Sequence, residues 1–177
     1  MMALPATAVF LALVATLLPS TRSRLDRRVV DVAEAGNARS EHDHGYVGDD
    51  VSRGVADGRA FRQGRGWMRY ALAVFDDTEV TIACTFLGGT TAPLTYELLV
   101  EDRVVAARTF TSATSTPTIV EFIVPFAITK AKSSIGVTLR ARGGLTPALV
   151  ELRTIQDHLE DNESSSNLWQ HLPPWSL

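Results

Sequence analysis

From residue 67 onward, hydrophobic and polar side chains alternate with a period of two, the pattern typical of half-buried β-strands. Turn-forming residues separate these segments, among them Asp76-Asp77 and the Gly88–Pro93 stretch, and Pro125 ends another segment because it cannot donate to a ladder. The expected strands are 67–74, 79–86, 94–100, 104–110, 119–124, 135–141 and 149–155. With no long helical period, the pattern predicts an all-β, jelly-roll-like antiparallel β-sandwich.

The chain before residue 67 lacks this alternation. Residues 25–40 are charged and are expected to lead into the domain as an extended segment. Residues 41–66 are rich in glycine and poor in aliphatic runs, which predicts a long ordered loop with one short strand at most. In a β-sandwich such loops gather at the ends and rims, where function is concentrated.

Both ends of the chain differ from its middle. An apolar run covers residues 3–18, and residues 1–23 are expected to be a signal peptide or apolar leader, with secretion or export to the periplasm. A signal anchor and a misassigned start within a longer gene remain open, since the arginines follow the apolar run. Residues 24–156 form the expected sandwich module, and the polar, serine-rich residues 157–177 are expected to be a disordered tail.

The amino-acid composition narrows the range of possible functions. The 177 residues, 45% hydrophobic and 21% charged, suit one globular domain with tails. A net charge of −3 provides no basic field for nucleic acid. The single cysteine excludes an intrachain disulfide, and on its strand Cys84 shares a face with apolar residues, which predicts a buried thiol.

Glu41, His42, Asp43 and His44 form one cluster of candidate functional residues. On a strand, the two imidazoles would point to one face and the two carboxylates to the other. Zinc would need a third or fourth ligand, and calcium would prefer the carboxylates with backbone carbonyls. A loop held by hydrogen bonds from Asp43 and His44, and contact with sugar hydroxyls, are the other interpretations. We expect no metal and no cofactor.

A second candidate group is formed by Arg59, Phe61, Arg62 and Trp67. A sugar ring can stack its C–H face on an aromatic side chain while arginines and carboxylates bind its hydroxyls. The alternatives are that Phe61 belongs to the core with both arginines paired to acids, and that Trp67 is buried. Alternation places Trp67 with Arg69 on one face of its strand, and Met68 with Tyr70 on the other.

The same segments resemble the C-terminal β-sandwich module of bacterial glycoside hydrolases that act on β-L-arabinofuranosides. That module opens with an acid-rich S-E-x-D-H element, continues with G-R-x-W-R and G-G-W-F-x-Y-x-L, and closes on L-R-T. The positions that match are Ser40, Glu41, Asp43, His44, Gly45, Gly58, Arg59, Phe61, Arg62, Gly66, Trp67, Tyr70, Leu72, Gly88, Gly89, Val124, Pro125, Leu152, Arg153 and Thr154. The chain departs from the pattern at Phe61, where the family has Trp, and at Met68, where it often has Phe.

The resemblance implies a non-catalytic, carbohydrate-binding or accessory module, because catalysis in those enzymes belongs to a separate helical-barrel domain with a cysteine-rich zinc site. The expected partners are an arabinose-containing glycan or a glycoside hydrolase catalytic domain, with no stable membrane span. A structural domain packed on a catalytic partner and a stand-alone secreted sugar-binding protein are the alternatives. The candidate carbohydrate-binding residues are Glu41, Asp43, His44, Arg59, Phe61, Arg62 and Trp67.

Overall fold

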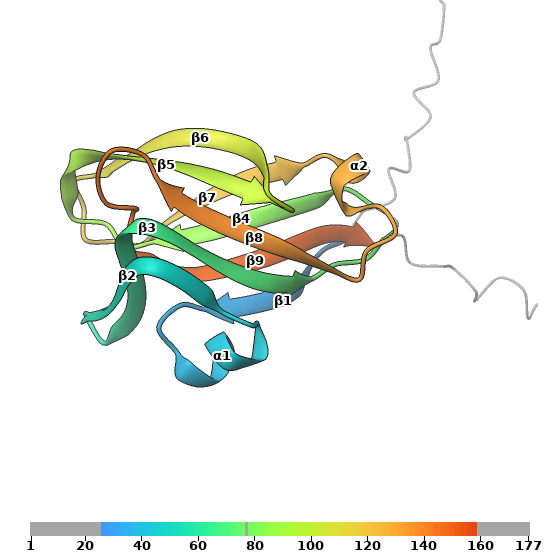
Figure 1. Ribbon diagram of the computed structural model, residues 1–177, viewed down its shortest axis with the longest axis horizontal. Helices are drawn as coiled ribbons and strands as arrows, with labels where there is room; N and C mark the ends of the chain where they lie inside the picture. The colour runs from blue at the N-terminus through green and yellow to red at the C-terminus, as the bar shows by residue number, and fades with distance from the viewer. Residues whose placement is uncertain (1–25, 77, 159–177) are drawn as a thin grey trace, which may run out of the picture.

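The computed structural model describes residues 26–76 and 78–158, which contain nine strands and two short helices (Figure 1). In chain order these are β1 (Asp26–Glu34), α1 (Ala38–Asp43), β2 (Val47–Ala56), β3 (Arg59–Ala73), β4 (Val80–Phe86), β5 (Thr90–Val100), β6 (Arg103–Ser112), β7 (Thr118–Val124), α2 (Phe126–Thr129), β8 (Ser134–Ala141) and β9 (Leu149–His158).

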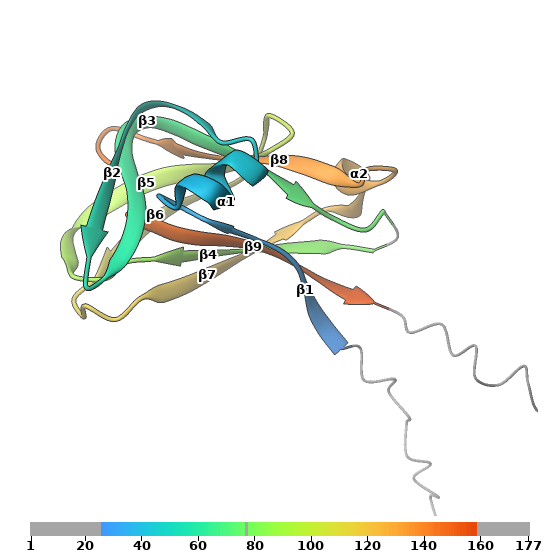
Figure 2. The same ribbon diagram turned by 90° about the horizontal axis from the view of Figure 1, so that it is seen from below.

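The strands form two layers that are joined along one side (Figure 2). The first layer has the order β6-β5-β8-β3-β2 and the second has the order β7-β4-β9-β1. A single pairing between Arg62 of β3 and Leu149 of β9 links the layers, so the sheet is continuous. Every pairing is antiparallel. The predicted all-β, jelly-roll-like antiparallel sandwich is therefore confirmed.

The core lies between the two layers, and strand alternation fills it. In β3, Met68, Tyr70 and Leu72 are fully buried, while Trp67 and Arg69 are on the opposite face, as the alternation predicts. Cys84 of β4 is buried in this core, which confirms the prediction of a buried thiol, and burial raises its pKa. Aromatic rings close the far end of the core, with the centroid of Phe86 5.3 Å from that of Tyr96.

The strands expected from residue 67 onward are all present, and their bounds differ from the expected ones by a few residues at most ends. The main extension is β3, which begins at Arg59 rather than at residue 67. The expected leader 1–23 and most of the expected tail 157–177 lie outside the described residues. Within the described part of the chain, neither helix is long and apolar enough to cross a membrane.

The expectation for residues 25–66 is wrong in part. Residues 26–34 are an ordered strand, and residues 38–43 are a helix whose N-cap, Asn37, accepts hydrogen bonds from two backbone N–H groups. Residues 47–73 form the β2–β3 hairpin rather than a long loop. The alternation fails there because β2 pairs only with β3 and is exposed along most of its length, so it needs few apolar residues.

Candidate functional site

Glu41 and Arg62, two of the predicted sugar-binding residues, form a buried ion pair. Arg62 donates from Nε to Glu41 Oε1 over 2.7 Å and from Nη2 to Oε2 over 2.6 Å. The backbone N–H of Gly36 donates to Oε1 over 2.7 Å, and the hydroxyl of Tyr70 lies 3.4 Å from the same oxygen. The Arg62 guanidinium carbon lies 4.6 Å from the centre of the Tyr46 ring. We call these five residues the Glu41 lock.

The Glu41 lock uses its polar atoms internally. The two side chains of the ion pair are only 8% and 18% exposed, so a ligand reaches little of either. Burial alone would raise the pKa of Glu41, but the hydrogen bond and the charge of Arg62 and the Gly36 N–H together hold it below its usual range. Such a bidentate, charge-assisted pair fixes α1 against β3.

Asp43 and His44 lie beside the lock without entering it. His44 caps the C-terminal end of α1, and its ring nitrogens lie 2.6 Å from the Ser40 carbonyl oxygen and 3.1 Å from Asp31 Oδ1. Asp43 is exposed and approaches Arg39 at 4.0 Å. Because the segment is helical, the strand geometry expected for His42 and His44 is wrong. Among the described residues, no group of three His, Cys, Asp or Glu could hold a metal ion.

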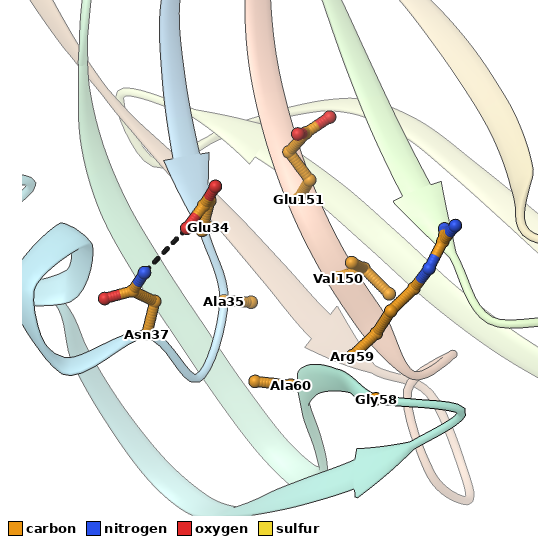
Figure 3. Close-up of a pocket in the computed structure, with 8 residues that line it drawn as sticks. All are labelled: Glu34, Ala35, Asn37, Gly58, Arg59, Ala60, Val150 and Glu151. Carbon is orange, nitrogen blue, oxygen red and sulfur yellow. Dashed lines mark hydrogen bonds between the residues drawn. The ribbon is translucent and has the colours of Figure 1, made fainter.

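Next to the lock lies an open polar pocket of about 310 Å³, drawn in Figure 3. Its polar groups are Glu34 at the end of β1, Asn37 before α1, Arg59 at the start of β3 and Glu151 on β9. Its apolar lining comes from Ala35, Gly58, Ala60 and Val150. We call this the Arg59 pocket. Figure 3 shows the Arg59 side chain extending from the hairpin alongside Val150, with Glu151 further along β9.

Two tight turns build this pocket. Asp57 and Gly58 both have positive φ (51° and 73°), so the β2–β3 hairpin turns sharply and presents Arg59 directly after it. Gly36, with φ of 78°, turns the chain from β1 into α1, and its carbonyl accepts a hydrogen bond from Arg53 Nε over 2.6 Å. The pocket is therefore fixed by backbone geometry on both sides.

The polar groups of the Arg59 pocket are only partly satisfied by the protein. Glu34 accepts one hydrogen bond from the Asn37 amide over 2.6 Å. Glu151 accepts from Arg153 Nε and lies 3.5 Å from the Thr85 hydroxyl, both through Oε1. Arg59 forms no ion pair with any of the described residues, and it is exposed. Carboxylate oxygens, one N–H of the Asn37 amide and a guanidinium thus remain available to a polar ligand, whereas the Asn37 side-chain carbonyl oxygen is occupied by the helix N-cap hydrogen bonds.

The remaining predicted residues lie elsewhere. Phe61 is half-buried, and its ring covers Gly54 on β2, where an added Cβ would overlap it. Trp67 is half-exposed on the outer face of the first layer, away from the Arg59 pocket, which lies against β1 and β9 of the second layer. Trp67 is thus outside the buried core but not fully exposed, and the pairing alternative holds for Arg62, whereas Arg59 forms no ion pair with any described residue.

Three polar residues of the pocket, Glu34, Asn37 and Glu151, were not among the predicted site residues. They come from β1, the α1 N-cap and β9, which are far apart in sequence and meet only through the β1–β9 pairing that sets Glu34 opposite Glu151. The Asp57-Gly58 dipeptide and the N-cap residue Asn37 are sequence signals for a hairpin and a helix start. They would have located the two turns but not the pocket between them.

Residues 24–155 match the family described as a family of unknown function, DUF6805. The chain belongs to this family. A search among curated proteins finds no match.

Several solved structures share the fold. A family 35 carbohydrate-binding module from Clostridium thermocellum matches with a TM-score of 0.51 and 11% identity, covering 70% of this chain and 95% of that one. A module of the same family from Paenibacillus barcinonensis matches at 0.53 and 12%, covering 70% and 96%. An exo-β-1,3-galactanase from Phanerochaete chrysosporium in complex with β-1,3-galactotriose matches at 0.56 and 9%, covering 72% of this chain and 29% of the enzyme. At these identities the likeness shows the fold alone.

Proposed function

We propose that this chain is a non-catalytic carbohydrate-binding module that serves a glycoside hydrolase acting on arabinofuranosides, and that its sugar site is the Arg59 pocket. The observation that carries the proposal is that two carboxylates, an amide N–H and a guanidinium that forms no ion pair with any described residue line one open cavity together with apolar groups. Sugars offer many hydroxyls that both donate and accept, and a site of mixed donors and acceptors satisfies them. The fold shared with carbohydrate-binding modules and the sequence resemblance both support it.

The chemistry of the pocket favours a neutral glycan. Arg59 donates to sugar oxygens, whereas Glu34 and Glu151 accept from sugar hydroxyls, so a diol bridging them would use all three groups. The apolar lining from Ala35, Ala60 and Val150 would contact the C–H side of a ring. The pocket volume of about 310 Å³ lies at the lower end of the roughly 300–1,000 Å³ of small-molecule pockets, so the pocket accommodates one or two sugar residues.

The same pocket is poorly suited to hydrolysis. Glycoside hydrolysis needs one carboxyl group that stays protonated, which requires a desolvated apolar site. Glu34 is exposed and accepts a hydrogen bond from Asn37, and Glu151 accepts one from Arg153, so neither carboxyl group lies in an apolar site. Carboxyl groups in such polar surroundings suit hydrogen bonds to sugar hydroxyls.

Isothermal titration calorimetry with α- and β-linked arabinofuranosyl oligosaccharides tests the proposal. We expect weak binding by the wild type, with a Kd of about 1 mM or below, equivalent to roughly −4 kcal/mol. Arg59→Ala should lose about 1.5–3 kcal/mol, the contribution of a charged hydrogen bond, and so abolish measurable binding.

Arg39→Ala is the matched control, because the Arg39 side chain is also an exposed arginine, at 94%, and lies outside the pocket. It should bind as the wild type does. Equal binding by Arg59→Ala and Arg39→Ala would place the sugar elsewhere, and no binding by the wild type at high concentration would refute the proposal for the pocket.

The outer face of the second layer favours a different function, that of a domain docked on a partner. The strand register places Val29, Ile155, Thr81 and Ile123 in one row across β1, β9, β4 and β7. Val29 and Ile123 are 49% and 64% exposed. If this face binds a catalytic domain, Ile123→Lys should weaken co-purification with that domain and leave sugar titrations unchanged.

A further inference from the structure

The outer face of the first layer carries a second cavity, of about 240 Å³, around Trp67. Its other lining residues are Arg69 on β3, Leu99 on β5, Asp102 in the β5–β6 turn, and Thr138 and Arg140 on β8. We call it the Trp67 cavity. It lies on the opposite layer from the Arg59 pocket and shares no residue with it.

Strand register defines how these residues surround the cavity. Trp67 is paired with Arg140, and Arg69 is paired with Thr138, so the four side chains stand at the corners of one square on the sheet face. Thr138 is in turn paired with Leu99 of β5. Leu99 and Thr138 are only 6% and 8% exposed although they face away from the core, so they form the floor.

The two arginines reach away from each other, which keeps the space between them open. Arg69 donates from Nη1 to Asp102 over 2.7 Å, and its guanidinium lies over Gly136, where any Cβ would overlap it. Arg140 donates from Nε and Nη2 to Glu97 Oε2 over 3.0 Å and 2.6 Å. The indole of Trp67 is half-buried, and the cavity beside it is bounded by Arg69 and Arg140 above a floor that neighbouring side chains largely cover.

Three arginines on this face bond two carboxylates. Arg142 also donates to Glu97, through Nη2 to Oε1 over 2.7 Å, so both oxygens of one carboxylate serve two guanidinium groups. Arg69 bonds Asp102, and the strand register adds the carboxylate of Asp49 beside Trp67, so the charges of these residues balance. Several N–H groups of Arg69 and Arg140 take no part in these bonds, since each guanidinium has five donors.

We propose that the Trp67 cavity is a second binding site, which takes a single acidic sugar residue. The ring stacks on the indole over Leu99, and the carboxylate accepts hydrogen bonds from Arg69 and Arg140. An aromatic wall suits the C–H face of the ring, and the unused N–H groups of the two arginines bond a carboxylate more strongly than the hydroxymethyl group of the neutral sugar of the same shape. The inference rests on the proposed function only in taking the ligand to be a sugar, because it uses different residues on a different layer.

The test compares methyl β-D-glucuronide with methyl β-D-glucoside by NMR titration of the full-length chain. The indole N–H resonance of Trp67 is assigned by Trp67→Phe. We expect the glucuronide to shift it and to bind about tenfold more tightly than the glucoside, because charge-assisted hydrogen bonds are roughly twice as strong as neutral ones. Raising the salt concentration should weaken only the glucuronide.

Variants separate this site from the Arg59 pocket. Arg69→Gln and Trp67→Ala should each reduce glucuronide affinity about tenfold, by loss of a charged donor or of the ring contact. The ion-pair partner of Arg69, Asp102, is exposed, so the Arg69→Gln variant keeps the fold, as an unchanged thermal midpoint would show. Arg59→Ala should bind the glucuronide normally.

Equal affinity for glucuronide and glucoside would overturn the acidic-sugar assignment. Absence of any shift at the Trp67 indole, or loss of glucuronide binding in Arg59→Ala but not in Arg69→Gln, would overturn the site. Neither result bears on arabinofuranosyl binding at the Arg59 pocket, which the calorimetry tests separately.

Discussion

Two acid–arginine sets from the same two segments of the chain have opposite surroundings. Glu41 and Arg62 in the Glu41 lock are buried and hydrogen-bonded to each other on both carboxylate oxygens. Glu34 and Arg59, a few residues away in each segment, line an open pocket without pairing. The same residue types therefore stabilise the fold in the Glu41 lock and are available for binding in the Arg59 pocket. The two sets differ in their exposure and in the number of polar atoms without a hydrogen bond.

The strongest test of this difference is the removal of Glu41. Glu41→Ala leaves the Arg62 guanidinium buried without its partner, and breaking a buried pair in this way should cost about 3–5 kcal/mol of unfolding free energy. Chemical denaturation measures the change. Asp43→Ala is the control from the same helix, since Asp43 is exposed and should change stability by less than about 0.5 kcal/mol. Equal, small losses in both variants would show that the lock does not hold α1.

The second-largest expected effect is the loss of stability caused by substitution of Gly36, which lies between Glu34 and Glu41 in the sequence. It donates to Glu41, has a positive φ, and an added Cβ would lie 3.1 Å from the Ala60 Cβ. Gly36→Ala should therefore cost about 1–3 kcal/mol of stability through backbone strain and crowding. Gly143→Ala is the matched control, because Gly143 has the same φ of 78° but no atom within 4 Å of the added Cβ. A loss no greater than in the control would mean that the contact with Ala60 is unimportant.

Acidity should weaken the Glu41 lock. The pKa of Glu41 is lowered in the folded state from an ordinary value of 4.5, so its contribution to stability is present above that value and is lost as pH falls through the folded pKa. Urea denaturation at pH 7 and at pH 3 should show a larger drop for the wild type than for Glu41→Gln, which has no carboxyl at this position to protonate. Parallel drops would contradict the assignment.

The last prediction concerns catalytic activity, which we expect to be absent. We expect no glycosidase turnover by the purified chain on aryl arabinofuranosides or arabinans, because neither carboxyl group of the Arg59 pocket lies in the apolar surroundings that a general acid needs. Glu34→Gln and Glu151→Gln preparations provide the background. Turnover by the wild type that disappears in either variant, or in Glu41 or Asp43 variants, would make this chain an enzyme.

The sequence predicts the sandwich well because its layers bury alternating side chains, as in β3 and β4. It predicts the region before residue 67 poorly because β2 is a mostly exposed strand with little to bury, and α1 buries only Glu41. The site residues were predicted by type, which cannot distinguish Arg59 from Arg62. Their difference depends on pairings such as Glu34 with Glu151, made across more than a hundred residues of chain.

The central claim is that the Arg59 pocket, not the Glu41 lock, binds the sugar, and chemical-shift mapping tests it most directly. Titration of the ¹⁵N-labelled chain with an arabinofuranosyl oligosaccharide should shift the backbone amides of Ala35, Asn37, Ala60 and Val150, which line the pocket. The amides of Tyr46 and Tyr70 in the lock should stay in place. Shifts centred on Tyr46 and Tyr70 with none at Ala60 and Val150, or no shifts at saturating sugar, would contradict the account.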